Sequence, residues 1–246
     1  EELDIIANNL DPDLFPNINW RDLMLKKLSP KYIANINMSG GGSNVTYFVS
    51  LGYTNQAGIY KSKSAENKYN TNTTYERFNY RANVNMNVTK TTLVRVGVSG
   101  YLINQTKPGG ETSDIWGAFS SLTPLTLPRR YSNGKEPAIG NTKTPEYHMT
   151  KTGYKTIWSN KMETNISIEQ DLDFITKGLK FKGSFAFDTD NENEIKRKKT
   201  PELWQTDGTR DAYGDLVLRK VQEIGLMKQE SKTSGNKRYY TEAYLN

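Results

Sequence analysis

Several residue types and patterns are scarce in this sequence, and each scarcity excludes a class of protein. Cysteine is absent, which excludes disulfide bonds and thiolate chemistry. No run of about 18 apolar residues occurs, and the mean hydropathy is -0.75, so the sequence predicts no transmembrane helix. The single histidine, His148, excludes a multi-histidine metal site, and its place in a polar stretch predicts a solvated side chain. We therefore predict no enzyme and no metal centre.

Charge is plentiful but evenly spread. The 33 basic and 27 acidic residues give a net charge of +6 and form one dense basic run, at 196–199. No aromatic-rich basic motif of the RNA-binding kind accompanies this run, so we interpret it as a solvated segment and predict no nucleic-acid partner. No phosphate-binding G-x-x-x-x-G-K-[ST] motif occurs, and no cofactor is predicted.

The clearest positive signal is a period of two from Thr156 to Asp188. Even positions from 158 to 172 are mostly apolar, whereas the odd positions between them are polar or charged. After a connection around 174–178, the apolar positions resume on alternate residues from Leu179 to Phe187. Successive side chains leave a strand on opposite sides, so this pattern predicts two strands with one apolar and one polar face. Their length exceeds that of an ordinary globular strand and suits a strand that crosses a bilayer.

Three further hairpins are predicted on either side of this unit. Glycines at 40–42 turn strands 32–39 and 45–55, and Thr89–Thr91 turns strands 78–88 and 94–104. A last pair, 216–228 and 238–246, is predicted to turn at 233–236. Long polar connections, predicted as loops, fill 56–76, 105–152 and 189–215, with short helices expected at 20–28, capped by Asn19, and at 114–122, capped by Ser113 or Asp114.

Short turns that alternate with long loops are typical of outer-membrane barrels, with short periplasmic turns and long extracellular loops. We predict an all-β, antiparallel transmembrane β-barrel segment of about eight strands over residues 31–246. Residues 1–30 are predicted to be an irregular segment in the first outer loop. Two alternatives stay open: a complete small eight-stranded barrel with a structural or adhesive role, and a soluble carbohydrate-binding β-sandwich. The charged strand faces disfavour the sandwich, and the C-terminal strand without a partner favours a piece of a longer protein.

A family resemblance rests on the segment from Asn37 to Tyr53, NMSGGGSNVTYFVSLGY, followed by NQAGIY at 55–60. Supporting segments lie at 13–20, 77–84, 88–90, 153–155 and 172–179. Together they resemble the SusC/RagA family of TonB-dependent outer-membrane transporters. The resemblance implies a barrel of about 22 strands around a plug, of which this chain supplies an early part of the wall.

The resemblance also implies where the protein works and with what. It places the chain in the bacterial outer membrane, in contact with outer-membrane lipid, as part of an importer of glycans, oligosaccharides or peptides. It implies a SusD-like surface lipoprotein as partner, and a TonB complex that acts through a part outside this chain.

Two sets of residues are candidates for contact with a polar nutrient. Aromatic rings stack on sugar faces and guanidinium groups bind hydroxyls or carboxylates, which singles out residues of the longest loop. These loop candidates are Trp116, Arg129, Arg130 and Tyr131. The polar positions of the predicted strands form a second set, a wall that faces the lumen. This set comprises Asn79, Arg81, Asn83, Asn85, Lys161, Glu163 and Asn165.

One acidic stretch, Asp188–Glu194, has oxygen ligands spaced like the start of a calcium loop. It lacks the turn glycine, because Asn193 takes that position, and its twelfth position is Lys199 instead of a glutamate. A hydrated outer loop is therefore the favoured interpretation.

Overall fold

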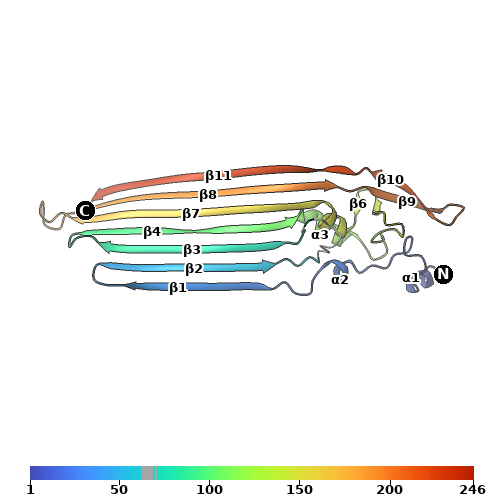
Figure 1. The fold of residues 1–246 in the computed structure, drawn as a ribbon, viewed down its shortest axis with the longest axis horizontal. Helices are drawn as coiled ribbons and strands as arrows, with labels where there is room; N and C mark the ends of the chain where they lie inside the picture. Colours follow the sequence, from blue (N-terminus) through green and yellow to red (C-terminus); the bar gives the residue numbers. More distant parts are fainter. Residues whose placement is uncertain (62–68, 70) are drawn as a thin grey trace.

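The main body of the protein, seen in a computed structural model that describes residues 1–61, 69 and 71–246, is a seven-stranded antiparallel sheet. Its order is β1-β2-β3-β4-β7-β8-β11, so the strands of this sheet lie side by side in the order in which they occur in the sequence (Figure 1). The strands are β1 (Lys31–Gly41), β2 (Val45–Ala57), β3 (Thr74–Asn87), β4 (Thr92–Pro108), β7 (Gly153–Asp171), β8 (Lys180–Thr200) and β11 (Gly225–Leu245). The predicted all-β antiparallel fold is confirmed.

Strand pairing joins the apolar positions of separate strands into continuous rows. Side chains directly opposite each other in an antiparallel pair lie on the same face. One such row comprises Tyr47, Val84, Val96, Ile166 and Phe185. We call this side of the sheet the apolar face and the opposite side the polar face. Ile166 on this face is 49% exposed. A β-sandwich requires a second sheet over the apolar face, and within the described residues no second sheet covers it.

The number of strands differs from the prediction. β11 runs unbroken through 233–236, where a turn was expected, and Gly235 pairs there with Asn191 of β8. β8 likewise continues to Thr200 through a stretch predicted to be a loop. We call the end of the sheet away from the short turns its upper end. The upper halves of β8 and β11 carry polar residues on both faces, so they lack the alternation that reveals a strand in sequence. The sheet therefore has seven strands instead of eight, and β1 and β11 are its two edges.

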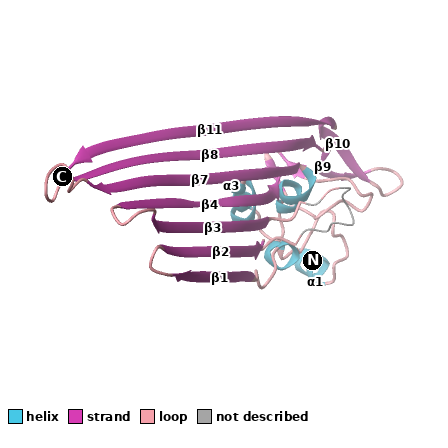
Figure 2. Cartoon of the chain, turned by 60° about the vertical axis from the view of Figure 1, so that its left-hand side comes forward, coloured by secondary structure: helices cyan, strands magenta, loops and turns pink. Residues whose placement is uncertain are grey.

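The other predicted turns are confirmed, at 42–44, 88–91 and 172–179, and they gather at one end of the sheet (Figure 1). The long connections lie at the opposite end, together with residues 1–30 (Figure 2). Those residues contain α1 (Glu2–Ala7) and α2 (Trp20–Met24). They join the long connections through backbone hydrogen bonds from Ile18 to Pro124 and from Lys61 to Met24.

The buried core lies among these connections instead of within the sheet. We call residues 1–30, 109–152 and 201–224 the loop cluster. It also contains α3 (Thr112–Ser121), β5 (Ala138–Ile139), β6 (Thr142–Lys143), η2 (Tyr147–Lys151), β9 (Leu203–Arg210) and β10 (Leu216–Gln222). Its largest apolar core comprises Trp20, Met24, Ile115, Leu122, Leu127 and Met149.

Two helix caps show where the sequence was informative. Asn19 caps α2 as predicted, because its side chain accepts a hydrogen bond from the Asp22 backbone, although the helix ends early, at Met24. The predicted cap of α3 is wrong: its N-cap is Glu111, whose side chain makes no capping hydrogen bond. Glu111 instead binds lysines of the sheet. No helix in the described part of the chain is long and apolar enough to cross a membrane.

Candidate functional site

The polar face brings together the residues predicted to form a wall. Asn79 and Lys161 lie in one cross-strand row, on either side of Tyr101. Arg81 and Glu163 lie in the next row, on either side of Ser99. Asn83 and Asn165 flank Gly97 in the row after that, and Asn85 pairs with Arg95. The register thus places all of the predicted wall residues on one face, and their contact with a solute stays a prediction.

A hollow of about 440 Å³ marks the centre of this face. On its β7 side, Lys161 Nζ lies 2.5 Å from Glu163 Oε1, and Ser99 Oγ donates to Glu163 Oε2 at 3.4 Å. On the other side, the Arg77 guanidinium lies over the Tyr101 ring, 4.4 Å from its centroid. The sequence did not single out Arg77, Ser99 or Tyr101, because their importance depends on which residues the register places beside them. The alternation of odd and even positions within each strand indicated only the face on which they lie.

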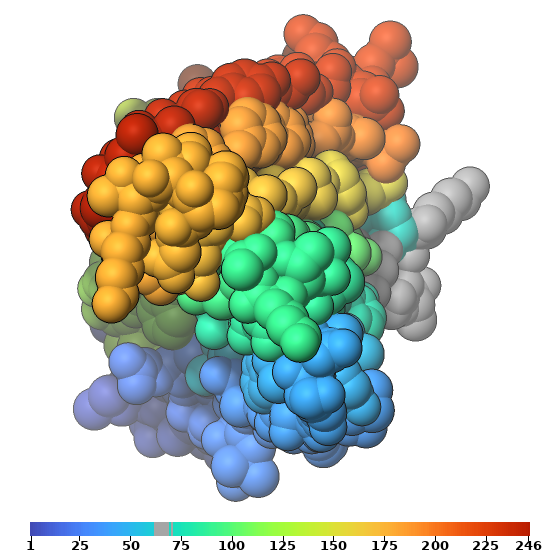
Figure 3. Space-filling model, turned by 90° about the vertical axis from the view of Figure 1, so that its left-hand side faces the viewer, coloured from blue at the N-terminus to red at the C-terminus, as the bar shows by residue number. Residues whose placement is uncertain are grey.

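The loop cluster folds over the upper end of the polar face. Lys155 and Lys196 are direct neighbours on β7 and β8, and both bind Glu111 at the start of α3, at 3.5 and 2.6 Å. Seen from the short-turn end, the colours run in sequence order from blue at one edge of the molecule through green to red at the other (Figure 3). The hydrogen bond from Lys196, together with the charge of Lys155, holds the pKa of Glu111 below its usual range.

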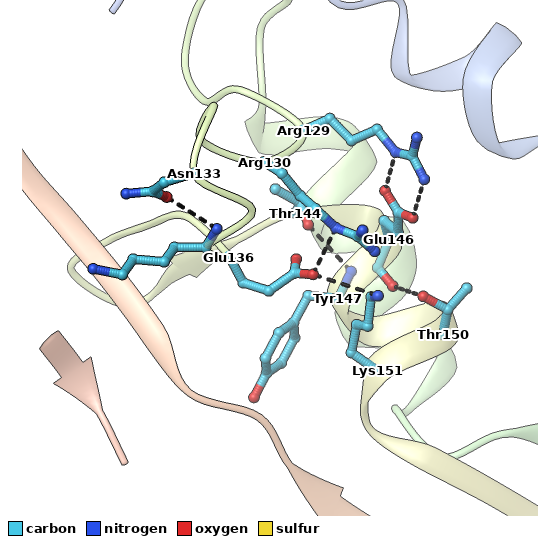
Figure 4. Close-up of polar contacts among 10 residues, drawn as sticks. Arg129, Arg130, Asn133, Glu136, Thr144, Glu146, Tyr147, Thr150 and Lys151 are labelled. Carbon is cyan, nitrogen blue, oxygen red and sulfur yellow. Dashed lines mark hydrogen bonds and ion pairs between the residues drawn. The ribbon is translucent and has the colours of Figure 1, made fainter. Parts of the chain in front are cut away.

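Two of the predicted loop residues have partners within the loop cluster (Figure 4). Arg129 binds Glu146 through two parallel hydrogen bonds, of 2.6 Å from Nε and 2.7 Å from a terminal nitrogen. Arg130 Nε donates to Glu136 at 2.9 Å, and Lys151 lies 3.4 Å from the same carboxylate. The forked Arg129–Glu146 pair is strong, and together with the contacts of Glu136 it holds residues 129–151 in one arrangement.

Tyr131 and Trp116 are placed very differently. Tyr131 is 3% exposed, and burial raises the pKa of its hydroxyl. Trp116 is 39% exposed on α3, with its ring 5.5 Å from that of Phe119 and 6.4 Å from that of Tyr60. Contact between these loop residues and a solute stays a prediction, and Trp116 is the one whose ring has substantial open surface.

Two expectations about titratable residues are corrected. Asp188–Glu194 is part of strand β8, so its carboxylates at even positions share the polar face, while the odd positions face the other way. Alternate residues of a strand lie about 6.6 Å apart, too far for this stretch to wrap one calcium ion as a loop does. His148 is partly buried beside Tyr147 instead of solvated, and burial lowers its pKa.

This chain is similar to a known protein over a short part of its sequence. No family model matches the chain. Over 56 residues it is 43% identical to TonB-dependent receptor P26 of Formosa agariphila, a match that covers 23% of this chain and 6% of that receptor. Over this stretch the chain is similar to a TonB-dependent receptor. The resemblance to SusC/RagA transporters noted in the sequence is confirmed at this level.

A solved structure agrees with this chain in fold. The RagAB peptide importer in its closed-closed state matches with a TM-score of 0.53 at 16% identity, over 94% of this chain and 31% of that chain. A second RagAB peptide transporter structure matches with a TM-score of 0.49 at 20% identity, over 75% of this chain and 20% of that chain. The chain thus spans less than a third of the importer chain that it matches.

Proposed function

We propose that this segment forms part of the wall of a TonB-dependent transporter that imports large polar nutrients across the bacterial outer membrane. The observation that carries the proposal is the two-faced sheet. Continuous apolar rows cover one side of the strands, and amides, hydroxyls and charges cover the other. A wall of this kind meets lipid outside and a wet passage inside.

The depth of the apolar rows supports a membrane location. On β4 the apolar positions extend from Val94 to Leu102, a span of about nine residues, and Asn104 follows. A tilted strand needs about nine to eleven residues to cross the hydrocarbon. The ring pair Tyr53–Phe78, at 4.8 Å, lies in the row of Leu102, at the border of this span, where interfacial aromatic residues gather in barrels. On β8, Phe187, which lies 5.1 Å from Tyr239, is the last apolar residue before the polar half of the strand.

The nutrient is proposed to be a glycan, an oligosaccharide or a peptide. Asn79, Asn83 and Asn85 offer amides, which hydrogen-bond equally well to sugar hydroxyls and to peptide groups. A SusD-like surface lipoprotein is the proposed partner at the long-connection end. The TonB complex is proposed to act through a part outside this chain. The similar RagAB proteins are a peptide transporter and a peptide importer, which supports the peptide option.

The wall is tested with single cysteines in the full-length transporter, in outer-membrane vesicles. We expect Ile166→Cys, labelled with a fluorophore, to be quenched by brominated lipids, and Ser167→Cys to react with a membrane-impermeant maleimide instead. The two residues are neighbours on opposite faces of β7. Equal quenching at both positions would contradict the two-faced wall.

Import is tested by uptake of fluorescent oligosaccharide and oligopeptide pools into cells with and without the transporter. We expect deletion to abolish the energy-dependent uptake of one pool. Unchanged uptake of both pools would refute the proposed function, whatever the cysteine experiment shows.

A further inference from the structure

The hollow on the polar face contains more positive than negative charge. Its lining includes the cations Arg77, Arg81 and Lys161 and one carboxylate, Glu163. Lys161 and Glu163 neutralise each other at 2.5 Å. The charge that remains on the lining is that of the two arginines on β3, which lie four positions apart on the same face. Asp188 and Asp190 of β8 lie one strand beyond, opposite Glu163 and Lys161.

The two arginines differ in how they are held. Arg77 is fixed by the Tyr101 ring and by a 2.8 Å hydrogen bond from its Nε to Asn79 Oδ1. Within the described residues Arg81 makes no hydrogen bond or ion pair, although its charge acts on Glu163, two strands away in the same row. Its guanidinium group carries five N–H donors in a planar fork. Elsewhere on this face the same group is satisfied, because Arg95 binds Glu169 at 3.2 Å.

The neighbours of Arg81 suit an anion. Ser50 of β2 and Ser99 of β4 lie directly opposite it, one on each side. Ser50 offers a hydroxyl donor, whereas the Ser99 hydroxyl already donates to Glu163. Phe48 and Tyr101 line the same hollow. A planar fork beside a hydroxyl donor matches the geometry of a carboxylate, which accepts two parallel hydrogen bonds.

We propose that Arg81, with Ser50, forms a carboxylate-binding subsite for the solute that passes this wall. The inference rests on the proposed function and deepens it, because it names an acidic solute, such as a uronic-acid oligosaccharide or a peptide with a free carboxylate. Ser99 lies within the Val94–Leu102 span, so the subsite is inside the passage, below the loop cluster. Arg77 adds a second positive charge that draws the anion into the hollow.

The test uses the full-length transporter in detergent and two probes that differ in charge alone: a tetragalacturonide and its methyl ester. Calorimetry measures the Kd of each probe for the wild type, for Arg81→Gln and Arg81→Lys, and for Arg95→Gln as the matched control. We expect the wild type to bind the acid more tightly than the ester. Arg81→Gln weakens acid binding by about tenfold to a hundredfold, because charged hydrogen bonds are lost, and leaves ester binding unchanged.

The conservative variant and the control sharpen the outcome. Arg81→Lys keeps the charge without the fork, so its affinity for the acid lies between those of the wild type and Arg81→Gln. Arg95→Gln changes acid binding less than twofold, because its guanidinium is already paired. A wild type that holds acid and ester equally, or binds neither, overturns the proposal.

Two further results test the solute assignment and the proposed function separately. Arg81→Gln could instead lower the melting temperature of the probe-free protein and leave acid binding intact. That result would mean that Arg81 pairs with a carboxylate of the transporter itself, and it would overturn the solute assignment. Energy-dependent uptake by wild-type cells reports on the proposed function alone. If the purified protein binds the acid through Arg81 and cells import nothing, the subsite stands and the proposed function fails.

Discussion

The loop cluster buries apolar side chains, whereas the sheet exposes them on one face. Each buried hydrophobic residue among those described lies in the loop cluster, for example Ile115 and Leu127, both 1% exposed. The strands instead hold Ile36, Ile166 and Phe185 on an open face. The loop cluster therefore draws its stability from its own core, whereas the sheet depends on surroundings that cover its apolar face.

The comparison predicts that mutations in the two regions change different quantities. Core mutations in the loop cluster should loosen that cluster and leave the strands intact. Mutations on the apolar face should affect insertion of the whole wall.

The largest effect is expected from Leu127→Ala. Removing a fully buried side chain leaves a cavity, and we expect the free energy of opening of the loop cluster to fall by about 2–5 kcal/mol. Hydrogen exchange of α3 and η2 in the full-length protein measures this change. Leu125→Ala is the control, because Leu125, two residues away, is 51% exposed. Faster exchange throughout the strands would contradict the separation of the two regions.

The next effect is on the sheet. We expect Ile166→Lys to destabilise the inserted barrel by about 2–4 kcal/mol, because it places a charge against the middle of the bilayer. Ser167→Lys, on the polar face of the same strand, should be tolerated. Urea unfolding of the full-length protein in liposomes measures both. Equal destabilisation by the two lysines would remove the distinction between the faces.

A smaller effect is expected within the loop cluster from Glu146→Gln. The Glu146 side chain is 4% exposed and binds Arg129 through both oxygens. The amide keeps one acceptor and loses the charge, so we expect a local loss of about 1–3 kcal/mol. Protection of the η2 amides from exchange is the measurement, with the exposed Glu230→Gln as control. Unaltered protection would show that the pair does not hold the loop.

The smallest effect concerns the junction between the two regions. The pKa of Glu111 is lowered in the folded state, so its contribution is present above the usual value of 4.5 and is lost as the pH falls through the folded pKa. Because Glu111 is half exposed, we expect less than about 1 kcal/mol. Exchange of α3 amides, corrected for intrinsic rates, should rise on acidification below this pH. The rise should vanish in Glu111→Gln, and its persistence there would assign it to another group.

Sequence alone predicted the parts of the fold in which local chemistry and periodicity agree. The glycines at 40–42, the turn at 89–91 and the alternation in β7 each specify their structure with neighbours a few residues away. The upper halves of β8 and β11 escaped prediction because both of their faces are polar. Only the pairing of Gly235 with Asn191 and its neighbours shows that they are strands.

The candidate site divides in the same way. The parity of each strand placed Asn79, Arg81 and Glu163 on one face correctly. Parity does not say which strands are neighbours, so the stacking of Arg77 on Tyr101 was beyond prediction. The partner of Arg129 was hidden for a similar reason, because Glu146 reaches it through the folding of a long loop.

The unequal length of the strands has a geometric consequence for access. The row that contains Lys31, at the start of β1, meets β11 at Lys232, and β11 continues from there to Gly225. Its edge therefore overshoots that of β1 by about 23 Å along the strand direction. The strand ends on this side of the sheet therefore do not lie level: β8 and β11 extend farthest, and β9 and β10 lie beyond them (Figure 1). A molecule that approaches this end of the sheet meets a raised edge at β11 and a low edge at β1.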